Sequence, residues 1–173
     1  QSFPPIASAM AGVLILGSMP GKKSLADRQY YAHPQNLFWR ILGEITGADP
    51  ASPYEARVRA LKSRGIALWD VLESCTREGS LDSAIDDATI RANDFASFYR
   101  AHPRIARVFF NGAKAETCYR KYVLPSLADG PAPLDYRRLP STSPANAAMS
   151  LAYKHGVWTQ ALRPALAGRP RGA

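Results

Sequence analysis

Short apolar runs separated by amphipathic segments form the main pattern of this chain. Residues 12–16, 66–69 and 105–110 are apolar enough to be strands buried on both faces of a sheet. A fourth strand is expected over residues 136–139, Tyr-Arg-Arg-Leu. Strands that alternate with helices in this way predict a parallel sheet covered by helices on both faces.

Helical segments fill the intervals between these strands. The predicted helices cover residues 35–46, 52–61, 93–99 and 113–122. Gly47 is expected to end the first, whereas Pro53 and Asn93 are expected to begin the second and third. The tail over residues 145–166 is expected to be helical in two pieces, with a break near Gly156.

The fold class that follows is α/β, a three-layer sandwich whose central, mostly parallel sheet has four strands and carries helices on both faces. With 173 residues the chain has room for one well-packed domain, so residues 1–173 are predicted to form a single domain. In such folds the ligand lies at the carboxyl ends of the strands. Four segments leaving these ends carry small or polar residues, over 17–21, 70–72, 111–113 and 140–144. This coincidence predicts one shared site.

The chain is basic, with 22 Lys and Arg against 14 Asp and Glu, a net charge of +8 and a pI near 9.8. A polyanion is therefore the first partner to expect, and nucleic acid is favoured over a membrane surface. A hydrophobic content of 46% excludes a disordered chain. No apolar run approaches the roughly 20 residues of a membrane span, and no signal peptide is visible.

The Cys and His residues show no metal-site pattern. Cys75 and Cys118 lack both CxxC spacing and a disulfide framework, so we expect small core residues in helical or near-helical contexts. His33 has no Cys or carboxylate partner nearby in sequence, so no metal and no cofactor is predicted. Free cysteines fit a reducing cytoplasm, and we expect a monomer.

Two runs carry the candidate chemistry. Residues 17–21, Gly-Ser-Met-Pro-Gly, directly follow the first apolar strand. Glycine lets the backbone approach a ligand closely, so this loop predicts a pocket floor. Residues 32–39, Ala-His-Pro-Gln-Asn-Leu-Phe-Trp, add two aromatic rings, a His and an Asn. Together the runs indicate a site for a flat polar ring, and the basic charge suggests that the ring belongs to a nucleic acid.

These runs, with Phe-Asn-Gly-Ala-Lys-Ala at 110–115 and Leu-Pro-Ser-Thr-Ser-Pro-Ala-Asn at 139–146, resemble the motifs of the uracil-DNA glycosylase superfamily. The resemblance spans roughly residues 11–160 and is nearest the hypoxanthine-DNA glycosylase and mismatch-specific uracil/thymine branches. It implies the superfamily's fold and DNA as the partner. The chain has no four-cysteine pattern, which separates it from relatives that bind an iron–sulfur cluster.

The resemblance implies catalytic roles for Asn36 and Ser141. The superfamily usually has Asn or Asp before the proline of the first motif, where it holds the attacking water. Here that position is Met19, whose thioether cannot orient or deprotonate water. The hypoxanthine-glycosylase family is similar in lacking that residue, and an Asn matching Asn36 is implicated there. Ser141 matches the position that steadies negative charge on the departing base. The alternative for Asn36 is a helix cap.

Base binding is assigned to the first loop and to the strand ends. Tyr31 resembles the residue that stacks on the extruded base. Asp70 stands where an Asn reads the base edge in classical uracil glycosylases, and its carboxylate would accept from the lactam N–H of uracil or hypoxanthine. The alternative for Asp70 is a cap on the following segment. The predicted base-binding residues are Gly17, Ser18, Met19, Tyr31, Asp70 and Asn111.

The predicted DNA-binding residues are His33, Ser143, Ala145 and Asn146. Ala145 lies where relatives place a wedge side chain, and its methyl group is short for that task, so Asn146 is a candidate to fill the gap. In the alternative interpretation, His33 closes the turn before Pro34 and Ser143 caps a helix.

The predicted function is that of a monofunctional DNA glycosylase in base excision repair. It would flip uracil or hypoxanthine out of DNA and hydrolyse the N-glycosidic bond. Two alternatives stay open. One is a non-catalytic binder of damaged or single-stranded DNA, favoured by Met19; the other is a hydrolase of free nucleosides, whose activity would be indifferent to salt. The sequence does not decide between uracil and hypoxanthine, which share the lactam group and differ mainly in ring size.

Overall fold

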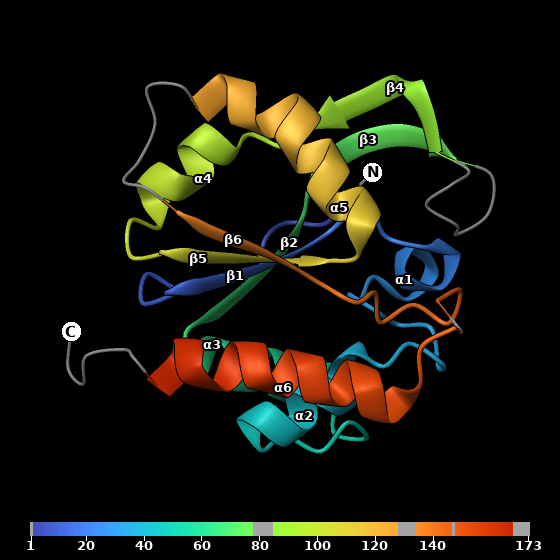
Figure 1. Cartoon of the computed structure of the whole chain (residues 1–173), viewed down its shortest axis with the longest axis vertical. Helices are drawn as coiled ribbons and strands as arrows, with labels where there is room; N and C mark the ends of the chain where they lie inside the picture. Colours follow the sequence, from blue (N-terminus) through green and yellow to red (C-terminus); the bar gives the residue numbers. More distant parts are fainter. Residues whose placement is uncertain (1, 78–84, 128–133, 147, 168–173) are drawn as a thin grey trace.

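The protein forms a parallel sheet between two layers of helices (Figure 1). This computed structural model describes residues 2–77, 85–127, 134–146 and 148–167. The strands of the sheet are β1 (Val13–Gly17), β2 (Ile66–Asp70), β5 (Arg107–Asn111) and β6 (Asp135–Leu139). Their order is β2-β1-β5-β6, and every neighbouring pair is parallel. The predicted four-stranded α/β sandwich is therefore confirmed.

The carboxyl ends of the strands meet at one edge of the sheet. Gly17 at the end of β1 pairs with Asp70 at the end of β2. Asn111 at the end of β5 pairs with Leu139 at the end of β6, and β1 and β5 are paired between these two couples. The loops that follow the strands therefore leave the sheet side by side.

Helices cover both faces of the sheet (Figure 1). One face carries α2 (Phe38–Thr46), α3 (Tyr54–Ser63) and α6 (Leu151–Ala167). The other carries α4 (Phe95–Ala101), α5 (Ala113–Cys118) and two short helices that continue it, η2 (Tyr119–Val123) and η3 (Leu124–Leu127). A further helix, α1 (Lys22–Asp27), follows β1 on the side where the strands end.

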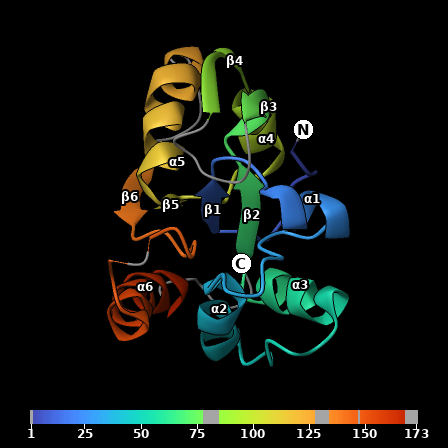
Figure 2. The same ribbon diagram turned by 90° about the vertical axis from the view of Figure 1, so that its right-hand side faces the viewer.

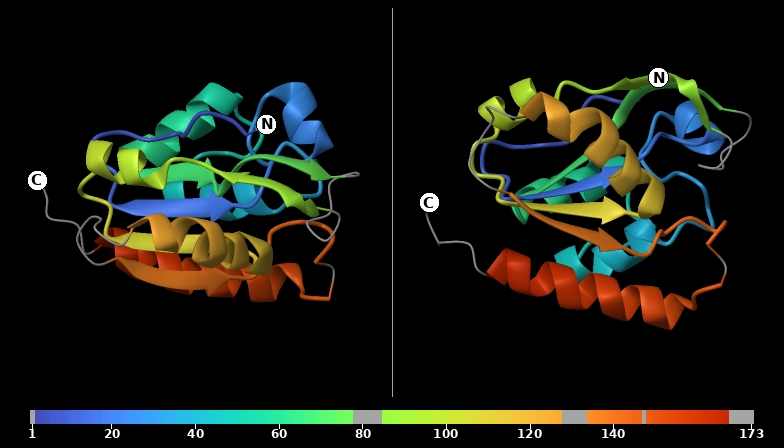
Figure 3. Two further views of the ribbon diagram at one scale, coloured as in Figure 1. Left: turned by 90° about the horizontal axis from the view of Figure 1, so that it is seen from above. Right: turned by 45° about the horizontal axis from the view of Figure 1, so that its top comes forward.

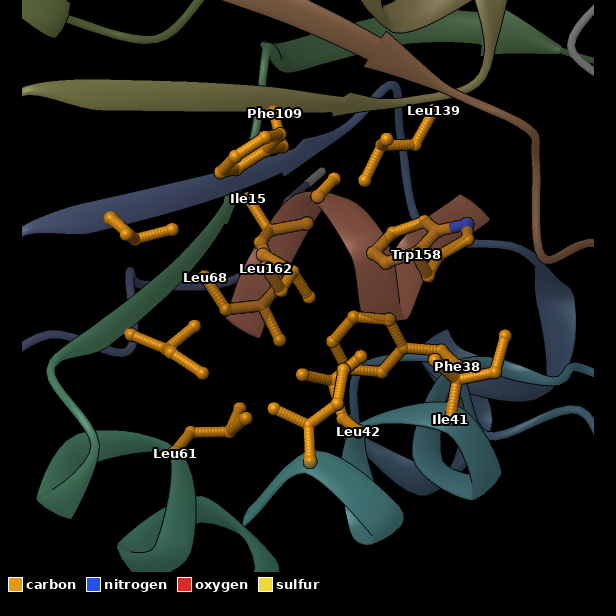
Figure 4. Packing of buried hydrophobic residues seen from close by; sticks show 14 of the residues in the cluster. Ile15, Phe38, Ile41, Leu42, Leu61, Leu68, Phe109, Leu139, Trp158 and Leu162 are labelled. Atoms are coloured by element: carbon orange, nitrogen blue, oxygen red, sulfur yellow. The ribbon is translucent and has the colours of Figure 1, made fainter. Parts of the chain in front are cut away.

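The residues of β1 show how one strand supplies both cores. Val13 and Ile15 join the cluster under α2, α3 and α6, whereas Leu14 and Leu16 join the cluster under α4 and α5. Successive side chains of a strand point to opposite faces, so a strand covered on both faces has no polar position. Figure 4 shows the first cluster, in which Trp158 of α6 lies beside residues from the sheet and from α2.

A second, antiparallel sheet lies on the α5 side of the main sheet and is not predicted by the apolar pattern (Figure 3). Its strands are β3 (Leu72–Arg77) and β4 (Ile85–Ala92), paired with two register shifts. The expectation of a helical context is wrong for Cys75, which lies in β3. Cys118 is buried in α5, as expected.

The expected break of the C-terminal helix near Gly156 is wrong. Helix α6 is continuous from Leu151 to Ala167, begins six residues after the predicted start at residue 145, and also contains Pro164. Packing of Trp158 and Leu162 into the core stabilises the helix beyond its local propensity. In the described ranges, neither α6 nor any other helix has the length and apolarity needed to cross a membrane.

Helix capping also differs from expectation. Asp94 rather than Asn93 caps α4, and its carboxylate accepts a hydrogen bond from the N–H of Ser97 at 3.0 Å, which lowers the pKa of Asp94. Helix α2 begins at Phe38 rather than at residue 35, and it ends as predicted at Gly47, which is left-handed with φ +82°.

Candidate active site

A cavity of about 450 Å³ opens at the edge where the strands end. Figure 2 looks onto this edge, with α1 and the loops that follow the strands toward the viewer. Each of the four predicted loop segments contributes to the lining. All twelve predicted site residues line the cavity: Gly17, Ser18, Met19, Tyr31, His33, Asn36, Asp70, Asn111, Ser141, Ser143, Ala145 and Asn146. The predicted convergence is present, and the role given to each residue remains a prediction.

Gly17 forms the part of the floor where two side chains meet. A Cβ atom at this position would lie 2.6 Å from Asp70 Oδ1 and 2.8 Å from the hydroxyl oxygen of Tyr31, distances that real Cβ atoms do not reach. Only glycine therefore leaves room for both side chains. Asp70 is 3% exposed, so its carboxylate belongs to the cavity rather than to the outer surface.

The backbone around Asp70 is held on two sides. The N–H of Val71 donates to the carbonyl of Gly17 at 2.8 Å. The side-chain amide of Asn93 donates to the carbonyl of Asp70 at 2.8 Å. Asn93 thus positions this strand end instead of capping α4. The segment that follows Asp70 is strand β3, so Asp70 has no helix to cap and the alternative interpretation is not supported.

Tyr31 has a left-handed backbone, with φ +52°, which is uncommon for a residue with a side chain. Both flanking peptide groups are held in place. Trp39 Nε1 donates to the carbonyl of Tyr30 at 2.7 Å, and the N–H of Ala32 donates to Ser24 Oγ at 3.1 Å. Such a conformation costs of order 1–3 kcal/mol and persists where its surroundings fix it. Its result is a tyrosine ring at the cavity wall.

The ring of Tyr31 stacks on Phe38, with centroids 4.2 Å apart and planes inclined by 28°. An aromatic ring has two faces, so a residue that packs through one face can stack a base on the other. The neighbouring Tyr30 has another task. Its hydroxyl donates to the carbonyl of Pro4 at 2.9 Å, and burial, with a smaller effect of Asp70, raises its pKa far above the usual range. Tyr30 therefore stays protonated and acts as a structural wall.

Asn36 precedes Leu37, the N-cap residue of α2, and its side chain still satisfies the first N–H of the helix, much as the alternative interpretation describes. Its Oδ1 accepts from the N–H of Phe38 at 3.0 Å, just before the first turn of α2. The N–H of Asn36 donates to the carbonyl of His33, whose Nδ1 accepts from the N–H of Gln35 at 3.1 Å. A carboxamide oxygen carries two lone pairs and its nitrogen two hydrogens, so capping leaves Asn36 with capacity to bind a water.

Thr142 is a residue whose importance the sequence did not reveal. It is fully buried, and it joins the loop after β6 to two other segments. Asn111 donates to its hydroxyl and accepts from its N–H, both at 2.9 Å, and the N–H of Leu37 donates to its carbonyl at 3.1 Å. Ser141, Thr142 and Ser143 are three consecutive residues with a hydroxyl group, and the sequence does not indicate which of them is buried.

The rest of this loop is folded on itself at the cavity rim. Ser141 Oγ accepts from the N–H of Ser143, and Ser143 Oγ accepts from the N–H of Ala145, both at 3.2 Å. Helix α6 begins only at Leu151, so Ser143 closes a turn rather than capping a helix. Lys154 of α6 donates from Nζ to the carbonyl of Ser143 at 3.4 Å. Burial lowers the pKa of Lys154, which is only 3% exposed.

Comparison with known proteins agrees with this geometry. The family model of the uracil DNA glycosylase superfamily matches residues 4–162. The chain belongs to the uracil DNA glycosylase superfamily. It is accordingly a DNA glycosylase, with DNA as its substrate.

Two curated relatives, both named hypoxanthine DNA glycosylase, match 116 residues of this superfamily member. The protein from Methanosarcina barkeri is 45% identical, and that from Methanosarcina acetivorans is 40% identical. Each match covers 66% of this chain and 72% of the relative. A solution NMR structure of a Methanosarcina acetivorans protein, assigned provisionally as a uracil DNA glycosylase, is 34% identical with a TM-score of 0.78. That match covers 95% of this chain and 97% of the other.

The first loop of the cavity has a methionine, Met19, before Pro20. Met19 lines the cavity and packs partly against the core under α4 and α5. A thioether is at most a weak acceptor, so the capacity to hold water lies with Asn36, with hydroxyls such as that of Ser141, and with main-chain groups. Within the described ranges, no three His, Cys, Asp or Glu side chains are grouped so as to hold a metal ion.

Proposed function

We propose that the protein excises hypoxanthine from DNA, and uracil as the smaller base with the same lactam group. The observation that carries this proposal is the buried carboxylate of Asp70 beside Gly17 in the cavity. An ionised carboxylate only accepts hydrogen bonds, so it favours a base whose ring nitrogen carries a hydrogen. Hypoxanthine has this N1–H and uracil this N3–H, whereas neutral adenine and cytosine lack it. The names of the two curated relatives support hypoxanthine as the principal base.

Selectivity follows from the cost of an unpaired group. With adenine or cytosine in the cavity, the carboxylate of Asp70 would face a ring nitrogen that is itself an acceptor. Two buried acceptors facing one another cost more than a missing contact, and a site built to bind an N–H rejects analogues that lack it. Tyr31 stacks on the base and supplies affinity that does not depend on the base's identity.

Hydrolysis needs an oriented water and a stabilised leaving group. As the bond between C1′ of the sugar and the base nitrogen breaks, the electron pair stays with the base and positive charge develops on the sugar. Asn36 orients the water whose oxygen bonds to C1′, and the water then loses a proton to solvent. Because the sugar is already electron-poor, orientation matters more than deprotonation, and a carboxamide is sufficient. Ser141 and N–H groups of residues 17–21 stabilise the negative charge on the base.

DNA is held by the rim and by the overall charge. The net charge of +8 attracts phosphates at long range. His33, Ser143, Ala145 and Asn146 line the cavity and are at least partly exposed, so they position the strand rather than read its sequence. One copy of the chain supplies the whole cavity lining, which supports a monomer as the active form.

A panel of oligonucleotides tests this proposal. Duplexes carrying hypoxanthine, uracil, xanthine or thymine at one position are incubated with the protein and then treated with alkali, which breaks the strand wherever a base is missing. We expect breaks at hypoxanthine first and at uracil second, with none at adenine or cytosine controls. Binding without breaks would support the non-catalytic alternative. Activity on free inosine that does not depend on salt would support the nucleoside hydrolase.

A further inference from the structure

Two exposed apolar side chains, Met149 and Tyr153, flank the point where the chain passes from the cavity loop into α6. In the described residues, the exposed large apolar side chains are Met10 (42%), Leu25 (43%), Met149 (41%) and Tyr153 (55%). Isolated exposed apolar residues are ordinary, but Met149 lies two residues before the start of α6 and Tyr153 lies in its first turn.

Met149 lies beside a residue that lines the cavity. The side-chain nitrogen of Asn146, a lining residue, contacts Met149 Sδ at 3.8 Å. Asn146 also donates to the carbonyl of Ser141 at 3.4 Å, so its amide is turned back toward its own loop. Ala145, the other rim residue here, has only a methyl group. Of these three side chains, Met149 is therefore the one able to extend away from the protein toward bound DNA.

The helix that follows Met149 is anchored to the core and to the cavity loop. Ser150 follows it and caps the first turn of α6, its Oγ accepting from the N–H of Tyr153 at 3.1 Å. Trp158, further along α6, is fully buried and donates from Nε1 to the carbonyl of Pro140 at 2.8 Å. Helix α6 and the cavity loop are thus held together. The segment that carries Met149 is therefore attached to a rigid part of the protein.

A glycosylase acting on a duplex must fill the place of the nucleotide that it extrudes. Unstacking costs a few kcal/mol, and proteins that open base steps insert apolar side chains, methionine among them. Methionine is unbranched and polarisable, so its side chain can adapt to the space between two flat rings. We propose that Met149 enters the base stack of duplex DNA at the position that the flipped nucleotide leaves. This inference rests on the proposed function, because only an enzyme that flips a base creates that gap.

The test compares duplex and single-stranded DNA, because only a duplex has a stack to be filled. Excision of hypoxanthine is measured under single-turnover conditions on one sequence in both forms, for the native protein, Met149→Ala and Met149→Leu. We expect the ratio of the duplex rate to the single-strand rate to fall about tenfold or more in Met149→Ala. Met149→Leu, which keeps an unbranched Cβ and a similar volume, is expected to preserve most of the ratio.

Met10→Ala is the matched control. Met10 is equally exposed, and it precedes β1, so it lies toward the opposite edge of the sheet, where its sulfur accepts from Arg104. We expect this variant to leave the ratio unchanged. An unchanged ratio in Met149→Ala, an equal fall in Met10→Ala, or a native protein that excises only from single strands would each overturn the inference.

A binding measurement separates this inference from the proposed function. A duplex with a tetrahydrofuran abasic analogue beside 2-aminopurine already contains the gap and needs no catalysis. We expect the native protein to change the 2-aminopurine fluorescence, and Met149→Ala to change it several-fold less. This result without any excision would reject the proposed function while keeping the wedge. Excision by the native protein with equal fluorescence changes in both proteins would reject the wedge alone.

Discussion

The side chains of Asn111 and Thr142 hold each other through two hydrogen bonds of 2.9 Å. Asn111 donates to the Thr142 hydroxyl, and the N–H of Thr142 donates to the Asn111 carboxamide oxygen. Asn111 ends β5 and Thr142 lies in the loop after β6, so the pair ties two walls of the cavity together. Both residues are buried, at 7% and 0% exposure, so the loss of either bond leaves a buried polar group poorly paired.

Thr142→Val is therefore expected to damage both the fold and the site. Valine keeps the shape but removes the acceptor for Asn111, leaving a buried donor unpaired at a cost of about 1–3 kcal/mol. Chemical unfolding and single-turnover excision check this expectation. Thr142→Ser, which keeps the hydroxyl, serves as the control and should lie much nearer to the native protein. Equal stability of the valine and serine variants would show that the paired bonds contribute nothing.

Gly17→Ala is expected to abolish most base excision while leaving the protein folded. The new methyl group would displace Asp70 and Tyr31, and a shift of about 1 Å at a reacting site can cost about 10²-fold in rate. Gly156→Ala is the matched control, since a Cβ there meets nothing within 4 Å. That helical substitution is expected to stabilise the protein by about 0.5–1 kcal/mol. Full activity in Gly17→Ala would mean that Asp70 and Tyr31 do not read the base.

Asn36→Ala is expected to lower kcat by at least about 10²-fold and to cost about 1 kcal/mol of stability, because it removes the water ligand and the cap together. Asn36→Asp separates the two effects. Aspartate can cap α2 and can also accept from water, so this variant should recover stability and part of the rate. Melting curves and single-turnover kinetics provide the two readings. If Asn36→Ala retains full activity, the water is held elsewhere.

Asp70→Asn is expected to change the preference among bases more than the total affinity for DNA. A carboxamide can present either a donor or an acceptor, so discrimination in favour of bases with a lactam N–H should fall by about 10-fold or more, as expected for one buried hydrogen bond. The four-base panel measures this directly, with binding to undamaged duplex as the control. An unaltered order of preference would refute the role of Asp70 in reading the base.

Lys154→Met is expected to leave stability at pH 7 within about 1 kcal/mol, because replacing a buried charge by an apolar group of similar volume is often neutral. Burial lowers the pKa of Lys154 below its ordinary value of 10.5. The folded state thus releases this proton before the unfolded state does, so the lysine's penalty is present at low pH and is relieved as the pH rises toward 10.5.

The stability difference between the native protein and Lys154→Met should accordingly shift in favour of the native protein on the alkaline side. Urea unfolding of both proteins across this range measures the difference, and subtraction removes the contribution of the buried tyrosines common to both. A pH-independent difference would mean that Lys154 titrates with its ordinary pKa in the folded protein.

The main sheet and the place of the site could be predicted from sequence because both depend on local pattern. The apolar run ending at Gly17 has the composition of a strand buried on both faces, and parallel strands must bring their carboxyl ends together. Residues 17–21 directly follow such a strand. The polar segments that follow the other predicted strands are therefore expected at the same edge of the sheet. The motifs at 32–39 and 139–146 then supplied further residues of the lining, whereas Lys23, Ser24 and Tyr30, which also line it, were not predicted.

The parts that were missed depend on long-range contacts. The hairpin of β3 and β4 has polar and charged residues along both strands, so no apolar period announces it. Asn93 looks like a helix cap locally, and only the folded chain brings its amide to the carbonyl of Asp70, 23 positions away. Likewise, the left-handed backbone of Tyr31 is fixed by Trp39 and Ser24, which no local pattern relates to it.

The most direct test of the whole account is to identify the product of the reaction. A duplex with one hypoxanthine is incubated with the native protein and with Gly17→Ala, and the small molecules and the strands are analysed separately by mass spectrometry. We expect free hypoxanthine and an uncut strand carrying one abasic site with the native protein, and almost none of either product with the variant. Tight binding of the duplex with no release of base by the native protein would contradict the account.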